Sequence, residues 1–362
     1  MTLYRYFLLR FFGGFLRVFA VFAGILVLVG TIDQLSSLRT GQGIGRAFYL
    51  AVLDQTRGMF TILPLVMAIA SVSVFIGLAR TSELVVVRAA GRSGLQFLIA
   101  PVSGALIIGA LAVAIFDPIA AATGKLYRLE TRNEGSSAVF SVTGGGVWLR
   151  QGDGAAQSVI KAAQVSNDGL TYENVSFFTF DENGNPISRI EARRAHLADH
   201  AWELTGARKW DLQAQNPAVS AMQLPDGTQL ATDLNIDKLT RGFGAPSDIS
   251  FWALPSYIAD LERSGFSARS YRVWLQMEMA LPLTLAVMVL IVAGFTMRHA
   301  RSGKTGQMVI YALMAAFAIF FLRNFAQVLG QNGQIPAFLA AWGAPIAAAL
   351  LAISLLLHLE DG

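Results

Sequence analysis

The stretch Thr81-Ser-Glu-Leu-Val-Val-Val-Arg-Ala-Ala-Gly91 lies between two long runs of residues, 59–79 and 95–116, that carry no charge. Each run is about as long as the roughly 20 apolar residues that a helix needs to cross the hydrocarbon core of a bilayer. The pair of runs therefore predicts two membrane-spanning helices. The connector is harder to explain, because a bare turn needs neither an acid, nor a base, nor a row of bulky aliphatic side chains.

The composition of the whole chain points in the same direction. Of its 362 residues, 54% are hydrophobic and only 14% are charged, whereas about a quarter of the residues of a typical soluble domain are charged. The chain has no cysteine, which excludes disulfides and thiolate metal sites, and its four histidines are too scattered to suggest a zinc site. The first residues lack the pattern of a cleavable signal peptide, and we expect none. These features predict an integral membrane protein.

Six segments have the length and apolar character of a membrane-spanning helix. They are residues 11–32, 59–79, 95–116, 273–297, 306–322 and 335–357. Basic residues near the span ends are more frequent on the side that holds the N-terminus, and such an excess marks the cytoplasmic side. The sequence therefore predicts that both termini are cytoplasmic and that residues 119–271 lie on the outer side of the membrane.

Residues 119–271 have the pattern of a β domain. Clusters of glycine, asparagine, aspartate and proline recur at short intervals, and runs rich in β-branched and aromatic residues lie between them. Asn183-Gly184, between residues 174–180 and 187–191, is typical of a tight hairpin turn. Many short strands at this spacing predict a β-sandwich or a jelly roll.

Residues 247–265 differ from the rest of this outer segment and predict a helix. Leu254, Ile258 and Leu261 recur at helical spacing on one face, and Gly265 is placed to end the helix. The predicted fold is then membrane α-helical, with six transmembrane helices and an inserted periplasmic all-β, jelly-roll-like domain. Its parts are residues 1–118 with spans one to three, 119–271 with the β domain and its short helix, and 272–362 with spans four to six.

The connector at 81–91 has the signals of a short helix of its own. A hydroxyl residue at its start can cap the helix, Glu83 then lies in the first turn, where the helix dipole favours an acid, and Gly91 can end it. A short structured helix between two spans is suited to contact a soluble motor protein on the cytoplasmic side. The alternative is a plain interfacial turn, in which Arg88 and Arg92 only enforce the topology.

The segment Ser82-Glu-Leu-Val-Val-Val-Arg-Ala-Ala-Gly-Arg-Ser93 resembles the coupling-helix signature of the lipopolysaccharide-export permeases LptF and LptG. The resemblance extends over nearly the whole chain, and its details are closer to LptG than to LptF. The connector phrase is the specific motif, and the other matching motifs are weak singly but fall in the right order. They are residues 3–6, 33–35, 145–148, 250–265, 279–288 and 335–339.

This resemblance implies a half-permease that pairs with an LptF-like second permease over a homodimeric LptB-like ATPase. The complex would extract lipopolysaccharide from the inner membrane of a Gram-negative bacterium and pass it, through an LptC-like partner, to a periplasmic bridge. ATP and Mg²⁺ would be used by the ATPase, whereas this chain would bind no cofactor, catalyse no reaction and have no nucleic-acid partner. The residues that the resemblance assigns to the ATPase contact are Ser82, Glu83, Leu84, Val87, Arg88 and Gly91.

A bulky lipid with a phosphorylated head needs an apolar wall and cations above it. The candidate residues for such a cavity are Arg39, Arg57, Phe317, Phe320, Phe321 and Arg323. The alternative for each of them is snorkelling to the interface or ordinary packing between helices. Many relatives in the family carry a lysine just after residues 33–35, where this chain has Ser36-Ser37. If that position binds a lipid phosphate, Arg39 would have to substitute for the lysine.

Two further features bear on function. Ser302-Gly-Lys-Thr305 ends like a phosphate-binding loop, but the earlier glycine of such a loop would fall at Arg298. We interpret it as a basic cytoplasmic turn, so any ATP must be hydrolysed by another chain. Glu278 lies inside the fourth predicted span, which makes it a candidate functional residue or the partner of a cation.

Two other functions stay open at this point. A stand-alone secondary transporter would show paired intramembrane acids or broken helices in corresponding halves, and neither is evident in the sequence. A membrane-anchored periplasmic scaffold or sensor would use the spans only as anchors, and it would be insensitive to changes at Glu83.

Overall fold

The computed structural model describes residues 2–37, 43–81, 83, 94–131, 139–143, 146–152, 157–166, 170–181, 184–198, 201–216, 219–232, 245–263, 267–296 and 305–361. The chain divides into two compact units. The helical unit comprises Met1–Glu130, Ser247–Trp252 and Arg269–Gly362, and the β unit comprises Thr131–Pro246 and Ala253–Ala268. The helical unit therefore extends past the predicted boundary at residue 118 and also contains a short segment from within 119–271.

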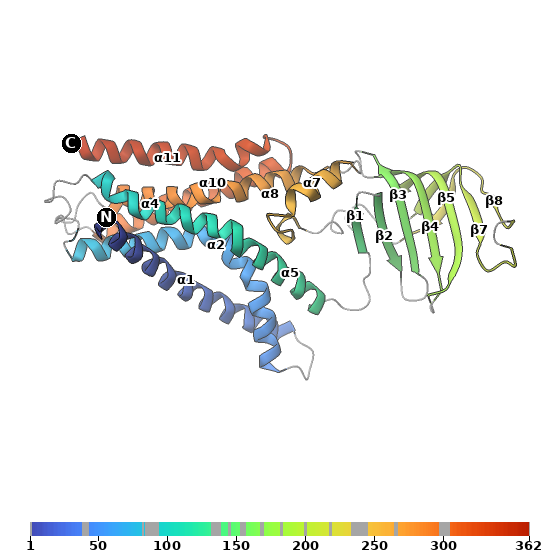
Figure 1. The fold of residues 1–362 in the computed structure, drawn as a ribbon, viewed down its shortest axis with the longest axis horizontal. Coiled ribbons are helices and arrows are strands. Elements are labelled where there is room, and N and C mark those ends of the chain that lie inside the picture. Colours follow the sequence, from blue (N-terminus) through green and yellow to red (C-terminus); the bar gives the residue numbers. More distant parts are fainter. Residues whose placement is uncertain are drawn as a thin grey trace. The chain divides into compact units, whose positions relative to one another are not determined.

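Five helical runs of the described chain are long and apolar enough to cross a membrane. They are α1 (Thr2–Ser37), α2 (Ile44–Arg80), the run of α4 (Gly94–Leu111), a π-helical segment (Ala112–Phe116) and α5 (Asp117–Thr131), α10 (Thr305–Gln331), and α11 (Ala337–Asp361). The pair α8 (Arg269–Met279) and α9 (Leu281–Thr296) makes a sixth if it counts as one span with a bend of 49°. Each of the six predicted spans thus coincides with a helix or a bent pair of helices (Figure 1).

The bend between α8 and α9 has a cause in the sequence. Pro282 has no N–H, and its ring clashes with the carbonyl of the residue four positions earlier, which is Glu278. Backbone hydrogen bonds from Ala280 N to Gln276 O, at 3.0 Å, and from Thr284 N to Ala280 O, at 2.9 Å, carry the chain across the break. The fourth predicted span is therefore two helices rather than one straight rod.

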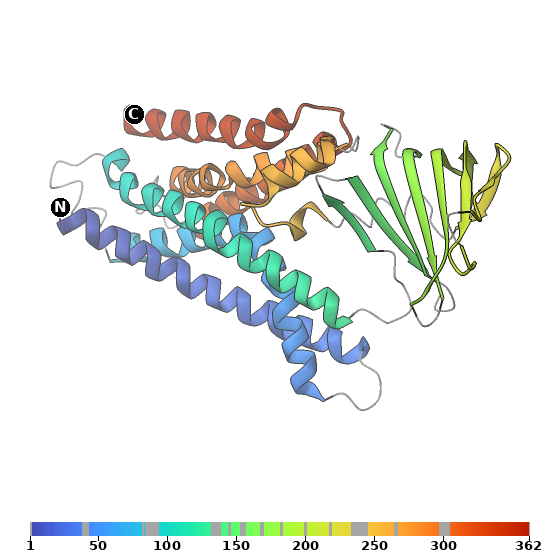
Figure 2. The ribbon, with the colours of Figure 1, turned by 45° about the vertical axis from the view of Figure 1, so that its right-hand side comes forward.

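The spans before and after the β unit share one apolar core. Its large buried side chains come from α1, α2, α4 and α9, and they include Phe11, Leu63, Met67, Phe75, Leu98, Leu285 and Met288. Gly109 of α4 permits a close approach of α9, because a Cβ on Gly109 would lie 2.4 Å from the Cα of Pro282. Figures 1 and 2 show both chain ends at the same end of the helical unit as the end of α2. Which side of the membrane this end faces stays a prediction.

The β unit is built on a nine-stranded antiparallel sheet. Its strands are β1 (Val139–Thr143), β2 (Gly146–Gly152), β3 (Gln157–Val165), β4 (Thr171–Phe180), β5 (Pro186–Ala198), β6 (Ala201–Thr205), β7 (Arg208–Asp211), β8 (Met222–Gln223) and β9 (Thr228–Ala231). The sheet order is β1-β2-β3-β4-β5-β6-β9, and β7 pairs with β5 and β8 off this path. The predicted antiparallel β domain is present, and its jelly-roll closure stays a prediction.

The predicted hairpin is confirmed as β4 and β5, in which Phe177 lies opposite Ile190. Gly184 in the turn has a φ of 81°, which glycine adopts without steric cost. One face of the sheet is strongly apolar: Tyr172 and Trp202 are fully buried, and their rings meet edge to face at 5.0 Å between centroids. Aromatic packing of this kind fixes which face of the sheet is the core.

The predicted helix within 247–265 is present as α7 (Leu254–Arg263). Leu254, Ile258 and Leu261 are its buried residues, as their spacing predicts. The residue predicted to end it, Gly265, lies outside the described residues.

Candidate functional site

The predicted connector helix is described only at its start. Thr81 follows α2, and its N–H donates a hydrogen bond to Gly77 O at 3.1 Å. Glu83 is helical. The remaining predicted contact residues lie outside the described residues, so their role stays a prediction; they are Ser82, Leu84, Val87, Arg88 and Gly91.

Glu83 links the connector to the first helix. Its Oε1 accepts a hydrogen bond from Thr81 Oγ1 at 2.8 Å and forms an ion pair with Arg10 Nη1 of α1. Its Oε2 accepts a hydrogen bond from Tyr6 OH at 3.3 Å. Two motifs that carry the family resemblance, residues 3–6 and the connector, therefore meet in space.

The environment of Glu83 favours its charged form. Partial burial raises the pKa of the Glu83 carboxyl, but hydrogen bonds from Thr81 and Arg10, the positive charge of Arg10 and the hydrogen bond from Tyr6 together outweigh it. The pKa therefore lies below its ordinary value. The side chain is 26% exposed. The carboxylate is thus held by three side chains and remains partly exposed.

The structure places Arg57, a predicted lipid-binding cation, in a buried charge cluster. Its Nη1 lies 3.1 Å from Oδ1 of Asp117, the first residue of α5, and Asp117 is fully buried. The guanidinium carbon lies 4.8 Å from the ring centroid of Trp274 on α8 and 5.4 Å from that of Phe60. Aromatic faces hold a cation by their quadrupole. Arg57 is therefore oriented by an acid and two aromatic rings. A cation that only snorkels to the interface does not need such partners.

Arg323 and Glu278 lie near the same cluster. Arg323 Nη2 donates to Met277 O at 3.3 Å, and the charges of Asp117, Arg57 and Arg323 all act on Glu278. Glu278 is 2% exposed. Within the described part of the chain, Glu278 Oε2, Arg323 Nε and Arg57 Nη2 are buried and have no hydrogen-bond partner. The structure thus brings two predicted lipid-site arginines and the predicted intramembrane acid together.

The predicted lipid-site residues do not all share this surface. Arg39 lies outside the described residues. Phe320 packs against the core of the helical unit, whereas Phe317 and Phe321 are 54% and 73% exposed. They belong to an exposed apolar stripe at helical spacing on α10, formed by Ile310, Met314, Phe317, Phe321, Phe325 and Val328. A stripe of this kind on a membrane-spanning helix contacts lipid chains or another spanning helix.

Sequence reasoning missed an apolar cavity of about 460 Å³ between α1, α2 and the run of α4, the π-helical segment and α5. The available signal was the helical spacing of Phe12, Phe15 and Phe19 in the first span. The larger lining side chains are Phe12, Phe15, Leu16, Phe19, Leu63, Ile108, Leu111, Ile115, Phe116 and Ile119. Such a lining is compatible with an acyl chain and offers nothing to a polar headgroup.

These features define a class of protein. Helices before and after an inserted β unit build one helical unit of membrane-spanning length, with an ordered acid at a connector and a charge cluster inside. Over the residues that the structure describes, no group of three or more His, Cys, Asp or Glu side chains is placed to hold a metal ion. The class is therefore a multi-span membrane protein whose features suit transport or anchoring.

Comparison with known proteins narrows this class to one family. The family of lipopolysaccharide export system permeases LptF/LptG matches residues 5–358, and the chain therefore belongs to it. The chain is 24% identical over 348 residues to the lipopolysaccharide export system permease protein LptG of Haemophilus influenzae, covering 92% of this chain and 93% of that protein. It is 26% identical over 326 residues to the protein of the same name in Escherichia coli K12, covering 87% and 86%. The resemblance predicted from the sequence is confirmed.

Proposed function

We propose that this chain is the LptG-type permease subunit of an ATP-driven lipopolysaccharide exporter in the inner membrane of a Gram-negative bacterium. The observation that carries the proposal is the family match over residues 5–358. The chain would be multi-pass, with both termini cytoplasmic and the β unit periplasmic. It would catalyse no reaction itself, because the ATP and Mg²⁺ of the cycle would be used by an LptB-like ATPase dimer.

The partners are those that the family membership implies. An LptF-like second permease would pack on the exposed apolar stripe of α10, and lipopolysaccharide would pass between the two permease chains. An LptC-like partner would receive the lipid on the periplasmic side, and the β unit would act as a jelly-roll conduit towards a bridge to the outer membrane. Residues 81–91 would form the coupling helix, in which Glu83 offers its carboxylate to a cation of the ATPase.

The first experiment is to tag this chain, extract the membrane in mild detergent and identify what co-purifies. The proposal expects a soluble ATPase together with a second chain of the same layout. A stable homo-oligomer without an ATPase would overturn it and favour the scaffold or the stand-alone transporter.

The role of Glu83 can be separated from its internal ion pair. Glu83→Arg should abolish co-purification of the ATPase while the chain still inserts into the membrane. Glu130→Arg is a matched control, because it reverses an acid of an exposed ion pair with Arg46 elsewhere on the helical unit. The double variant Glu83→Arg/Arg10→Glu restores a pair of opposite charges between α1 and the connector but not the acid offered to the ATPase. Recovery of the ATPase in the double variant would show that Glu83 acts only through Arg10.

A further inference from the structure

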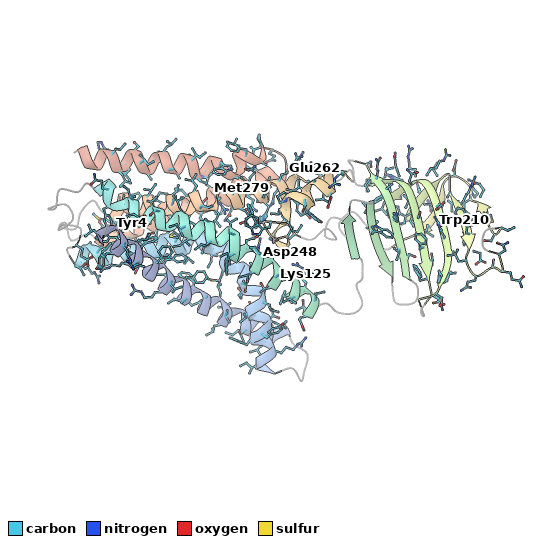
Figure 3. All side chains as sticks on the ribbon, viewed as in Figure 1. Tyr4, Lys125, Trp210, Asp248, Glu262 and Met279 are labelled. Carbon is cyan, nitrogen blue, oxygen red and sulfur yellow. The ribbon has the colours of Figure 1, made fainter. Side chains whose placement is uncertain are left out.

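The segment Ser247–Trp252, which we call the exit segment, leads from the β strands to α7 and belongs to the helical unit. Among the described residues, three polar contacts join it to one helical run. Arg128 Nη1 of α5 lies 2.6 Å from Asp248 Oδ1, and Asp248 is labelled in Figure 3. Phe251 N donates to Asp117 Oδ2 at 2.7 Å, and Trp252 Nε1 donates to Ala114 O at 3.1 Å. The exit segment is therefore fastened along this run.

The π-helical segment Ala112–Phe116 shapes this attachment. A π-helical turn is rare, widens the helix locally and occurs often at functional sites. Here it contains the carbonyl of Ala114, which accepts the indole N–H of Trp252, and it ends directly before Asp117. The irregular turn thus places a carbonyl and a fully buried carboxylate side by side towards the exit segment.

Asp117 also contacts a second element, the helix α2. Its Oδ1 pairs with Arg57 of α2 at 3.1 Å, while its Oδ2 holds Phe251 N. One buried carboxylate therefore joins α2 to the exit segment. Removing one charge of a buried ion pair is strongly destabilising, because water does not solvate the charge that remains.

α2 continues from Arg57 to Arg80, directly before the connector. At 1.5 Å per residue this part of the helix is about 35 Å long. A displacement of the connector therefore reaches Arg57 through a single helix, with Pro64 inside it. Asp117 connects Arg57 to Phe251 of the exit segment. Phe251 is followed in the chain by α7 of the β unit.

We infer that Asp117 is a positioning residue that transmits movement of α2 to the exit segment, so that the nucleotide state of the ATPase alters how firmly the segment is held. This inference rests on the proposed function. It assigns to the Arg57–Asp117–Phe251 contacts the coupling between the connector and the segment through which the chain returns from the β strands.

The test uses the complete complex that co-purifies with this chain, in lipid nanodiscs. Hydrogen exchange of the peptide that contains the Phe251 amide is measured without nucleotide and with ATP plus vanadate. The exchange rate in the unaltered complex should differ between the two states by about tenfold, equivalent to about 1.4 kcal/mol. Asp117→Asn keeps an oxygen for Phe251 but removes the charge that binds Arg57, and it should abolish this difference.

Controls separate positioning from folding. Glu130→Gln removes the exposed ion pair with Arg46, which also joins α2 and α5, and it should leave the difference intact. Arg57→Lys retains the charge and should also retain the difference. If Asp117→Asn does not assemble, Arg57→Gln breaks the same ion pair from the other side and should abolish the difference.

A second readout is the ATP hydrolysed per lipopolysaccharide transferred. Asp117→Asn should retain ATP hydrolysis and lower transfer, whereas Glu130→Gln should match the unaltered complex. The inference would be overturned if the hydrogen-exchange rate at Phe251 did not depend on nucleotide in the unaltered complex, or if it depended on nucleotide equally in Asp117→Asn. The proposed function would stand in both cases, provided that the complex still transfers lipopolysaccharide with ATP. Absence of an ATPase, or of ATP-driven transfer, would overturn the proposed function itself.

Discussion

Gly109→Ala tests the packing of α4 against α9, which joins the spans before the β unit to the spans after it. The added Cβ would lie 2.4 Å from Pro282 Cα, 3.0 Å from Pro282 Cβ and 3.1 Å from Pro282 N. Carbon atoms pack at about 3.5–4.0 Å, so the closest contact is roughly 1 Å too short. Neither atom can rotate out of the contact, because the added Cβ is bonded directly to the α4 backbone and the Cα of Pro282 belongs to the backbone of α9. The two helices must therefore separate.

The cost can be bounded from known cases. Overpacking of a core by a methyl-sized group costs about 1–3 kcal/mol. Replacing glycine by alanine inside a helix returns about 0.5–1 kcal/mol. The net destabilisation should therefore be about 0–2.5 kcal/mol, with a central value of about 1 kcal/mol, and the apparent melting temperature should fall.

The assay is thermal unfolding of the detergent-purified chain, followed by intrinsic fluorescence. Gly77→Ala on α2 is the matched control, because a Cβ there meets nothing within 4 Å, and it should be neutral or slightly stabilising. If Gly109→Ala melts at or above the temperature of the unaltered chain, α4 and α9 do not approach at this point. The packing that joins the spans on either side of the β unit would then be wrong.

Two further predictions concern the connector and the β unit. Because the pKa of Glu83 is lowered in the folded chain, its ion pair with Arg10 is complete above the ordinary carboxyl pKa, near 4.3, and is lost only as the pH falls through the lower folded value. ATPase co-purification should therefore be constant between about pH 6 and 8, and a loss near neutral pH would contradict the assignment. Trp202→Ala removes a fully buried ring in contact with Tyr172 and should cost about 3–5 kcal/mol. Limited proteolysis of the full chain should then cut the β unit first, and unchanged protection would place Trp202 outside the core.

Local patterns predicted those parts of the fold that local forces determine. The spans follow from apolar length, the β4–β5 hairpin from Asn183-Gly184, and the buried face of α7 from the spacing of three apolar residues. The end of the third span was harder to predict. Hydropathy falls at Asp117, where the helix was expected to give way to the β domain, but the helix continues to Thr131. Hydropathy reports where a helix leaves the hydrocarbon, not where its backbone hydrogen bonds end.

The site was less predictable because its contacts join distant parts of the chain. Asp117 meets Arg57 across 60 residues and Phe251 across 134, and no periodic pattern records such pairings. Sequence reasoning found Arg57, Glu278 and Arg323 singly, as charges in or near apolar spans. It proposed the arginines as ligands of a lipid headgroup and Glu278 as a possible partner of a cation, but no local pattern placed Asp117 beside Arg57.

The pairing of Arg57 also constrains the route of the lipid. While Arg57 holds Asp117, its charge is largely neutralised and is a poor ligand for a lipid phosphate. If the Arg57–Asp117 ion pair breaks when α2 moves, Arg57 is left without its acidic partner. This would happen as the cavity between the permease chains narrows. The same residue would then serve the link in one state and the lipid in the other. Asp117→Asn distinguishes the two roles, because it frees Arg57 permanently: lipopolysaccharide should bind more tightly without nucleotide while ATP-driven transfer falls. Weaker binding of the lipid in that variant would show that the ion pair itself shapes the lipid site.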